Sequence, residues 1–461
     1  MPTDRIPNRD ALLDHGAVDA RERALAVIER ALEAVQPERL LADRVSLHDD
    51  GTTLAIDGDR IPLADLGTVT VIGAGKGSRR VVEALLDRIG PVVDDGIVVE
   101  KHGQGGALPT VEVRTAGHPV PDADSLAAGA AVSERVRAAG PDDLVVFCIT
   151  GGASALLAAP ADGLALSDLR AVTEVLLAAG APIEDLNAVR KHLSAIKGGR
   201  LARETAPARA VTLVVVDEVA GEPWGPTVPD RTTFADARAA LDRHDVLEAV
   251  PTAVRDHLDR GVADPAMATP NAAALAPLDH RILTLADASD LCDAAVDGAG
   301  DVGLEALVLS SVLEGESREV GTVLAGIARE VRERGRPVAP PCAIVSGGET
   351  TVTLAAPDAA GSGGPNQELA LSAARRLAGM RDVALAAVDS DGTDGPTDRA
   401  GGLVDGTTVA RAAANGIDLD AHLDRHDAGT ALAAVDDAVC LDETGTNLMD
   451  LRVLVVLEST E

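Results

Sequence analysis

The chain has almost no aromatic residues. Among its 461 residues there are two Phe, one Trp and no Tyr. The cores must therefore be built from Leu, Val, Ile and Ala, and the stacking of bases on aromatic rings is largely unavailable. This composition argues against a single-stranded nucleic-acid-binding protein.

Cysteine and long apolar runs are also scarce. The four cysteines, Cys148, Cys292, Cys342 and Cys440, are dispersed, and none forms a Cys-x-x-Cys pair. Neither zinc nor a disulfide framework is indicated. No stretch approaches about 18 apolar residues without a charge, and the N-terminus has no apolar core of the signal-peptide kind. We therefore expect a soluble cytoplasmic protein without a membrane partner.

Lysine is the scarcest charged residue. The formal net charge is −33 at pH 7, which would repel DNA and anionic membranes. Abundant Asp and Glu with scarce Lys resemble the composition of proteins from extreme halophiles. The chain has only four lysines, Lys76, Lys101, Lys191 and Lys197, beside 37 arginines. Their positions are therefore informative.

Two of the four lysines lie in residues 184–203, for which the 3.6-residue spacing predicts one helix with two contrasting faces. The apolar face contains Leu186, Val189, Leu193 and Ile196. The polar face contains Asn187, Arg190, Lys191, Ser194 and Lys197, and Gly198-Gly199 supplies a helix stop. Such a stripe is ordinarily a solvated basic face. Because Lys is so rare here, we favour contacts between compact ammonium groups and phosphate oxygens.

A glycine-rich turn follows the apolar strand predicted near residue 70. The turn, Gly73-Ala-Gly-Lys-Gly-Ser78, leads into a helix over 79–89. Backbone N–H groups at a helix N-terminus can stabilise an anion. The spacing matches neither the dinucleotide fingerprint nor a Walker A loop. A tight turn with a solvated Lys76 therefore stays an equal alternative.

Two further strands end in polar loops. One strand, 96–101, ends at Lys101, and the apolar strand 144–149 leads into Thr150-Gly-Gly-Ala-Ser154. A fully apolar strand indicates a parallel sheet, and ligands bind at the carboxyl ends of such strands. His118 lies on a loop between Gly and Pro, where a hydrogen-bonding strut is about twice as common as a catalyst.

Two other predicted strands end in carboxylate residues. Asp217 ends the strand predicted at 210–217 and is either a magnesium ligand or a helix cap. Asp389, Asp391 and Asp394 begin an acidic loop. It is not an EF-hand, because a strand precedes it and Ala400 occupies the position of the bidentate Glu. In so acidic a chain, a solvated loop and a metal site are equally plausible.

The remaining pattern predicts a second α/β half. A Pro- and Ala-rich stretch, 263–278, is the best domain boundary, and a strand at 280–286 opens the second half. The stretch Ala343-Ile-Val-Ser-Gly-Gly-Glu-Thr-Thr-Val-Thr-Leu354 reads as a strand, a Gly-Gly turn and a second strand. Asn366 is a candidate cap of the helix predicted at 367–379.

These blocks together resemble the glycerate 2-kinase family, the MOFRL-type glycerate kinases formerly named hydroxypyruvate reductases. The matching stretches are Val71-Ile-Gly-Ala-Gly-Lys-Gly-Ser78, Ala116-Gly-His-Pro-Val-Pro-Asp122, Thr150-Gly-Gly-Ala-Ser-Ala-Leu-Leu157, Asn187 to Leu201, Gly225-Pro-Thr-Val-Pro-Asp230, Ser346-Gly-Gly-Glu-Thr-Thr-Val-Thr353, Gly363-Gly-Pro-Asn-Gln-Glu368, Asp391-Gly-Thr-Asp-Gly-Pro-Thr-Asp398 and Thr444-Gly-Thr-Asn447. They occur in order along nearly the whole chain, so the match is specific although each block alone is weak.

The resemblance implies two α/β domains with the active site in the cleft between them. The N-terminal domain, 1–268, would have a Rossmann-like parallel sheet with flanking helices. The MOFRL-type domain, 278–461, would have a mixed α/β sheet. The implied reaction passes the γ-phosphoryl group of ATP, with Mg²⁺, to the 2-hydroxyl of D-glycerate. A homodimer stays an open expectation.

The resemblance also implies residue roles. The catalytic candidates are Lys76, Arg190 and Asp217. The candidates for binding substrate or ATP are Gly75, Gly151, Gly152, Ser154, Asn187, Lys191, Lys197, Gly347, Gly348, Glu349, Thr350, Asn366, Gln367 and Glu368. The candidate metal ligands are Asp217, Asp391 and Asp394.

Two alternatives stay open. The family usually has Arg where this chain has Pro365, so a catalytically inactive ligand sensor is one alternative. The other is a nicotinamide-dependent hydroxypyruvate reductase, in which Glu100 would bind the ribose. Stabilisation by ATP–Mg²⁺ or by NADH would separate the kinase from the reductase.

Overall fold

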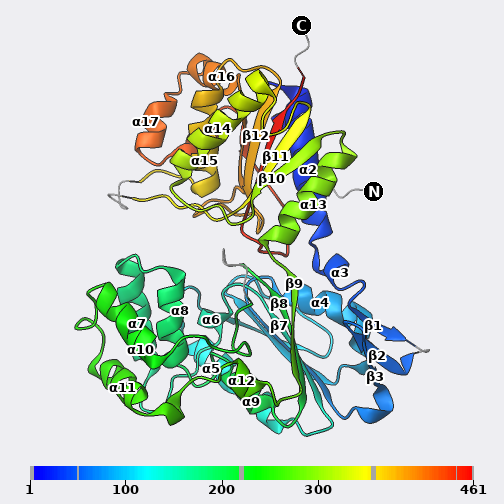
Figure 1. The fold of residues 1–461 in the computed structure, drawn as a ribbon, viewed down its shortest axis with the longest axis vertical. Helices are drawn as coiled ribbons and strands as arrows, with labels where there is room; N and C mark the ends of the chain where they lie inside the picture. Colours follow the sequence, from blue (N-terminus) through cyan, green and yellow to red (C-terminus); the bar gives the residue numbers. More distant parts are fainter. Residues whose placement is uncertain (1–4, 49–50, 218–222, 355–359, 443, 459–461) are drawn as a thin grey trace. The chain divides into compact units, whose positions relative to one another are not determined.

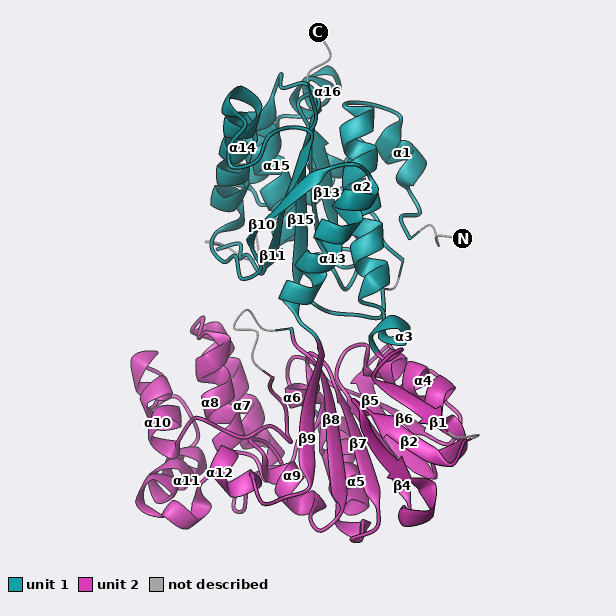
Figure 2. Ribbon diagram, turned by 45° about the vertical axis from the view of Figure 1, so that its right-hand side comes forward, with its two compact units in different colours: residues 1–40, 217–222, 286–461 teal, residues 41–216, 223–285 magenta. Residues whose placement is uncertain are grey.

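The computed structural model describes residues 5–48, 51–217, 223–354, 360–442 and 444–458. The chain forms two compact units, drawn in different colours in Figure 2. Unit 1 comprises residues 1–40, 217–222 and 286–461. Unit 2 comprises residues 41–216 and 223–285. Both units are α/β, as predicted.

A six-stranded sheet forms the centre of unit 2, in the order β6-β5-β4-β7-β8-β9. Its strands are β4 (Val69–Ala74), β5 (Asp95–Lys101), β6 (Glu112–Ala116), β7 (Leu144–Ile149), β8 (Arg209–Val215) and β9 (His280–Ala286). The pairs from β6 to β8 are parallel. In sequence order this is 3-2-1-4-5-6, so the strand order reverses between β4 and β7. The predicted Rossmann-like sheet is confirmed, and a ligand crevice is expected at this switch point.

Helices cover both faces of this sheet. The helices that pack on it are α4 (Ser78–Ile89), α5 (Ala123–Ala138), α6 (Ala153–Leu156) and α9 (Arg200–Thr205). Fully buried strand residues such as Ile72 and Phe147 pack with α5 residues such as Val132 in one core. A small antiparallel sheet lies beside α4 and comprises β1 (Val45–His48), β2 (Thr53–Ile56) and β3 (Asp59–Pro62).

A separate helical layer of unit 2 carries the basic segment (Figure 1). Its helices are α7 (Leu166–Ala178), α8 (Ile183–His192), α10 (Phe234–Arg243) and α11 (Thr252–Ala263), with the short α12 (Ala272–Leu275) beyond them. Leu186 and Val189 of α8 are buried against Phe234 and Leu241 of α10. Leu193 packs in the same core, so the predicted apolar face is confirmed for these three residues, whereas Ile196 packs in the core of the sheet.

The predicted helix over 184–203 is wrong in its length, because α8 ends at His192. Ser194 forms an isolated antiparallel bridge with Pro160, and its hydroxyl accepts hydrogen bonds from the N–H groups of Ile196 and Lys197. These local bonds compete with the helix pattern. Gly199 is the residue before α9, so the glycine pair begins a helix and does not stop one.

Unit 1 contains a mixed six-stranded sheet, also as predicted, in the order β10-β11-β15-β12-β13-β14. The strands are β10 (Glu305–Ser310), β11 (Cys342–Gly348), β12 (Val383–Asp389), β13 (Gly401–Asp405), β14 (Ala438–Val439) and β15 (Asp450–Val456). Only the β10–β11 pair is parallel. The strand predicted after Gly348 is absent from the described residues of that segment. There, Thr351 makes only a single bridge to Glu316.

Two helical layers enclose the mixed sheet. One face is covered by α14 (Ser317–Arg334) and α15 (Pro365–Leu377), and the other by α2 (Val18–Ala34) and α13 (Ala288–Asp301). Shorter helices complete the unit: α1 (Arg9–Leu13), α3 (Pro37–Leu40), α16 (Thr408–Ala414), α17 (Leu419–Asp424) and α18 (Ala428–Ala433). Within the described ranges, no helix is both long and apolar enough to span a bilayer.

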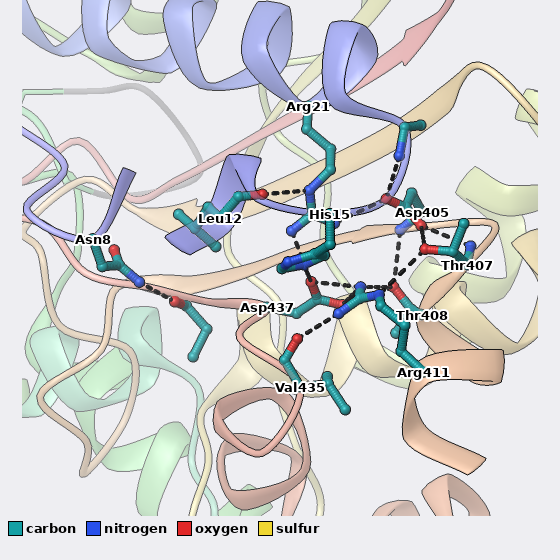
Figure 3. A network of polar contacts seen from close by, with 12 residues as sticks. Asn8, Leu12, His15, Arg21, Asp405, Thr407, Thr408, Arg411, Val435 and Asp437 are labelled. Atoms are coloured by element: carbon teal, nitrogen blue, oxygen red, sulfur yellow. Dashed lines mark hydrogen bonds and ion pairs between the residues drawn. The ribbon is translucent and has the colours of Figure 1, made fainter. Parts of the chain in front are cut away.

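The N-terminal segment belongs to unit 1 through a buried ion-pair network (Figure 3). Arg21 of α2 is fully buried and contacts Asp405 at 3.0 Å and Asp437 at 2.7 Å. Its Nε also donates to the carbonyl of Leu12 at 2.7 Å. Arg411 and His15 contact the same Asp437 carboxylate.

The compact units therefore differ from the predicted domains, 1–268 and 278–461. Residues 1–40 pack with the C-terminal part of the chain, and β9, expected to open the second domain, completes the sheet of unit 2. A linear boundary cannot describe a chain that enters one unit, leaves it and returns.

Candidate functional site

Two glycine-containing loops meet at the switch point of the unit 2 sheet. The first, Gly75-Lys76-Gly77, follows β4, and the second begins at Thr150 after β7. The N–H of Lys76 donates to the Gly151 carbonyl at 2.6 Å, and the Thr150 hydroxyl donates to the Lys76 carbonyl at 2.9 Å. At Gly75 (φ 126°), a Cβ would lie 2.2 Å from the Thr150 oxygen. The backbone contact therefore requires glycine there.

Positive charge gathers beside these loops. Burial and the charges of Lys76, Lys101 and Arg190 lower the pKa of His118 to about 4. The three cations come from the turn after β4, the end of β5 and helix α8. Burial also lowers the pKa of the half-buried Arg190. In a protein with a net charge of −33, this cationic group is suited to an anionic ligand.

The N–H groups at the start of α4, where the sequence predicts an anion site, already bind a carboxylate of the protein itself. Glu100 accepts hydrogen bonds from the N–H groups of Gly77 at 3.2 Å and Arg79 at 2.6 Å. Its side chain is buried, and burial raises its pKa to about 7 despite these bonds. The carboxylate of β5 therefore caps α4, and these N–H groups already have an intramolecular anionic partner.

Arg190, Lys191 and Lys197 do not share one environment. Lys191 donates to Asp230 at 3.1 Å, and this carboxylate is buried. Lys197 is buried beyond the end of α8 and donates to the Leu157 carbonyl at 2.5 Å. Burial, with a smaller effect from Arg190, lowers the pKa of Lys197 to about 7. The expectation that both lysines lie on one exposed helical face is therefore wrong.

The other candidates in unit 2 lie on the same elements. Gly151 is buried in the loop after β7, and Gly152 precedes the short helix α6. Ser154 is half-buried in the first turn of α6, and Asn187 lies on α8 one turn before Arg190. Their contacts with substrate or ATP stay predictions.

In unit 1, Asp394 holds the start of α15. Its carboxylate accepts from the N–H groups of Asn366 at 3.0 Å and Gln367 at 2.8 Å, and from both side-chain amides. Asn366 also donates to Asp450 at 2.6 Å. Asn366 is thus inside the helix and not its cap, since Gly364 occupies the cap position. Burial raises the pKa of Asp394 to about 6.

The remaining unit 1 candidates are held in packing or ion pairs. Glu368 is 2% exposed and pairs with Arg318 and His426 at 3.0 Å each. Thr350 is buried and accepts from Ser317 and Arg452. Gly347 and Gly348 lie in β11 itself rather than in the predicted turn, and the exposed Glu349 follows.

The predicted metal ligands do not form a preassembled set. Within the described ranges, only His102, Asp122 and Asp124 bring three ligand atoms within 4.8 Å of one another. Asp217 instead accepts from Asn447 at 3.4 Å. A magnesium site at Asp217, Asp391 and Asp394 stays a prediction, as does an active site in the cleft between the domains.

A carboxylate cluster nevertheless forms at the end of β12. Burial and the nearby charges of Asp391, Asp450 and Asp394 raise the pKa of Asp389. Burial also raises the pKa of Asp450, although Arg452 and Asn366 oppose this shift. Such crowding favours a bound proton or cation at this end of the sheet.

Several residues that organise the sites were not predicted from the sequence. Glu100 in β5, Asp230 in a loop and Asp450 at the start of β15 each accept a hydrogen bond from a residue that is remote in the chain. His118 was weighed mainly as a strut, yet its ring lies against the Gly152 loop. Its position between Gly117 and Pro119, in a chain with ten histidines, was the available signal.

Comparison with known proteins gives the family. The Domain of unknown function (DUF4147) family matches residues 23–259, and the MOFRL family matches residues 342–450. A glycerate 2-kinase from Pyrococcus horikoshii is 38% identical over 95% of this chain and 98% of its own length. A relative from Agrobacterium vitis, named as a hydroxypyruvate reductase, is 43% identical over 86% of this chain and 89% of its own.

A solved structure agrees. The crystal structure of a glycerate kinase from Thermotoga maritima has a TM-score of 0.81 and 33% identity, covering 95% of this chain and 99% of that one. The match therefore covers nearly the whole length of both chains. The chain therefore belongs to the glycerate kinase family with a DUF4147 region followed by a MOFRL region.

Proposed function

We propose that this chain phosphorylates D-glycerate at its 2-hydroxyl with ATP, giving 2-phospho-D-glycerate and ADP. The observation that carries the proposal is the group of cations, Lys76, Lys101 and Arg190, at the switch point of the unit 2 sheet. Both substrates and the phosphorylated product are anions. Phosphoryl transfer needs chiefly positioning and charge neutralisation, which these side chains can supply.

Lys76 is assigned to the anionic groups of the reacting substrates. It lies on a turn whose backbone is fixed by the Thr150 and Gly151 contacts, so its ammonium starts from a defined position. Arg190 on α8 would bind a carboxylate or phosphate, since its planar fork suits either group. Lys191 and Lys197 would instead hold the surrounding backbone through Asp230 and Leu157.

Mg²⁺ would be held by the acidic loop of unit 1. Asp389 and Asp391 are better ligands than Asp394, because both oxygens of Asp394 accept the N–H groups that begin α15. The repulsion that raises the pKa of Asp389 would be relieved by a divalent cation. When bound, Mg²⁺ supplies neutralising charge to the ATP phosphates. The cytoplasmic location and the dimeric state stay predictions.

The reductase alternative fits the residues less well. In a nicotinamide site of this topology, the acid at the end of the second strand would bind the ribose and the first helix would receive the pyrophosphate. Here that position is held by Glu100, which is buried and bonded to the start of α4. Glu100 thus stands at the position of the ribose-binding acid and also bonds the N–H groups that would bind the pyrophosphate.

The test compares both reactions with one preparation of the full chain in concentrated KCl. ADP formation is measured with ATP, Mg²⁺ and D-glycerate, and NADH oxidation with hydroxypyruvate. The proposal expects ADP formation that depends on D-glycerate, and no NADH oxidation above background. NADH oxidation without ADP formation would support the reductase. Absence of both would support the ligand sensor.

A further inference from the structure

His118 differs from every other histidine of the chain in the described residues. The chain has ten histidines, and nine of them have a ring nitrogen within hydrogen-bond distance of a protein atom. No such contact to the His118 ring occurs among the described residues. An imidazole that the protein leaves without a polar partner can serve a ligand.

The His118 ring nevertheless has a defined position, because it packs on a neighbouring loop. A Cβ at Gly152 would lie 2.9 Å from Nε2 and Cδ2 of His118, and 3.5 Å from Cγ of Lys76. The ring therefore packs directly on the loop after β7, beside the Lys76 side chain. The missing side chain of Gly152 makes room for the ring, and its φ of 85° is a second reason for glycine at this position.

The surroundings keep this imidazole uncharged. Burial is the largest cause of its lowered pKa, and the charges of Lys76 on the turn after β4, Lys101 at the end of β5 and Arg190 on α8 lower it further. A neutral imidazole offers one nitrogen acceptor, whereas an imidazolium offers none. A hydrogen-bond acceptor is thus held among cations, where an anionic hydroxy acid would be drawn.

We propose that His118 is the catalytic base that accepts the proton of the substrate hydroxyl. The inference rests on the proposed function and extends it. The O–H bond breaks and the proton passes to the free imidazole nitrogen. The hydroxyl oxygen bonds to the γ-phosphorus as the bond between that phosphorus and the β–γ bridging oxygen breaks. ADP leaves, and the imidazolium returns its proton to solvent.

The other buried acid–base groups nearby are less suited to this role. The Glu100 carboxylate is committed to the N–H groups of α4. Lys197 is committed to the Leu157 carbonyl. His118 lies beside a switch-point loop and has an unused hydrogen-bond acceptor, and neither of these two groups offers one there.

The first test uses His118→Asn and His118→Gln, which preserve one or the other nitrogen position without a titratable ring. Both variants should lower kcat by about 10²-fold or more, on the usual scale of general base catalysis, with KM values for ATP and D-glycerate within threefold. His48→Asn is the matched control, because His48 is exposed and its ring bonds only Ser46 among the described residues. It should keep the wild-type rate.

The pH profile gives a readout that a structural role would not change. In the wild type, kcat/KM should stay level from pH 8 to about pH 5 and fall below it, following the free imidazole. Bound anions raise the imidazole pKa, so the fall in kcat should begin at a higher pH. The residual activity of the variants should lack this acid limb.

The outcomes separate the two claims. A wild-type enzyme without glycerate-dependent ADP formation would overturn the proposed function. An active wild type, with variants that fold and keep more than a third of kcat, would overturn the role of His118 alone. Raised KM values with unchanged kcat would also overturn it. If neither variant folds, a wild-type profile without the expected acid limb decides against the proposal.

Discussion

Lys76 shows how far a single residue could be foreseen. Its rarity in the sequence and its place in a glycine-rich turn predicted contact with an anion. The structure places it on the first loop of the switch point, with its charge acting on His118. What could not be foreseen is the neighbour across the loop. The contacts with Thr150 and Gly151 join residues 74 or more positions apart.

The variant Lys76→Ala should lower kcat at least about 10²-fold, because one preorganised charge at the developing negative charge is removed. Initial rates with saturating ATP and D-glycerate measure this change. Arg39→Ala serves as the charge-matched control, since Arg39 is 64% exposed and pairs only with Glu33 among the described residues. Near-wild-type turnover of Lys76→Ala would contradict a catalytic role of Lys76.

Glu100 and Asp394 show which contacts of candidate residues the sequence could not predict. Each carboxylate caps a helix that is separated from it in the sequence, α4 in one case and α15 in the other. Capping residues are recognised from sequence when they immediately precede their helix. These two contact their helices through the tertiary fold, from residues 21 or more positions away in the chain. Sequence patterns therefore did not predict either capping contact, and the metal-ligand role of Asp394 stays a prediction.

Among the elements, the regular strands and helices followed the local pattern, and the exceptions have physical causes. The strands β4, β5, β7 and β12 lie where apolar runs predicted them. Helix α8 is shorter than the spacing of its apolar residues predicts, because the Ser194 hydroxyl accepts hydrogen bonds from two N–H groups that a longer helix would have used. No local sequence pattern predicted that α2 packs on the sheet of unit 1.

The network around Arg21 predicts which charge of α2 matters for stability. Arg21→Met should lower the free energy of unfolding of unit 1 by about 3–5 kcal/mol, since Asp405 and Asp437 would stay buried with fewer partners. Arg30→Met on the same helix removes an exposed pair with Asp301 and an exposed hydrogen bond to the Ala26 carbonyl, and should cost at most about 1 kcal/mol. Chemical denaturation followed by circular dichroism compares them. Equal losses would contradict this difference.

The same network should make stability depend on acid. Burial opposes ionisation of Asp437, but His15, Arg21 and Arg411 outweigh it, so its pKa is below the ordinary 3.8. A depressed carboxyl pKa stabilises the fold fully above about pH 4, and this contribution is lost as the pH falls through the folded-state pKa. Arg21→Met should therefore show a smaller loss of stability between pH 5 and pH 2 than the wild type. An unchanged slope would argue against the network as its source.

For the whole molecule, the net charge of −33 sets the conditions under which the fold is stable. Self-repulsion destabilises a compact acidic chain, and salt shortens the range of that repulsion. We expect the melting temperature to fall steeply as KCl is removed, with loss of activity in dilute buffer. A dilution series with differential scanning fluorimetry measures this. Full stability without salt would contradict the halophile interpretation of the composition.

At this scale the sequence predicted two α/β halves and the family, but not how the chain divides. The N-terminal 40 residues and the last 176 share one unit, although more than 200 residues lie between them. Composition along the chain shows where a linker could be. It does not show that an early helix completes a late sheet, because that depends on contacts between distant residues.

The central claim is tested most directly by the position of the new phosphate. The full chain is incubated in concentrated KCl with ATP, Mg²⁺ and D-glycerate, and the product is coupled to salt-tolerant enolase and pyruvate kinase without a phosphoglycerate mutase. Enolase accepts 2-phosphoglycerate, so the account predicts pyruvate formation without mutase. Pyruvate that appears only after mutase is added would mean phosphorylation at the 3-hydroxyl and would contradict the proposed reaction.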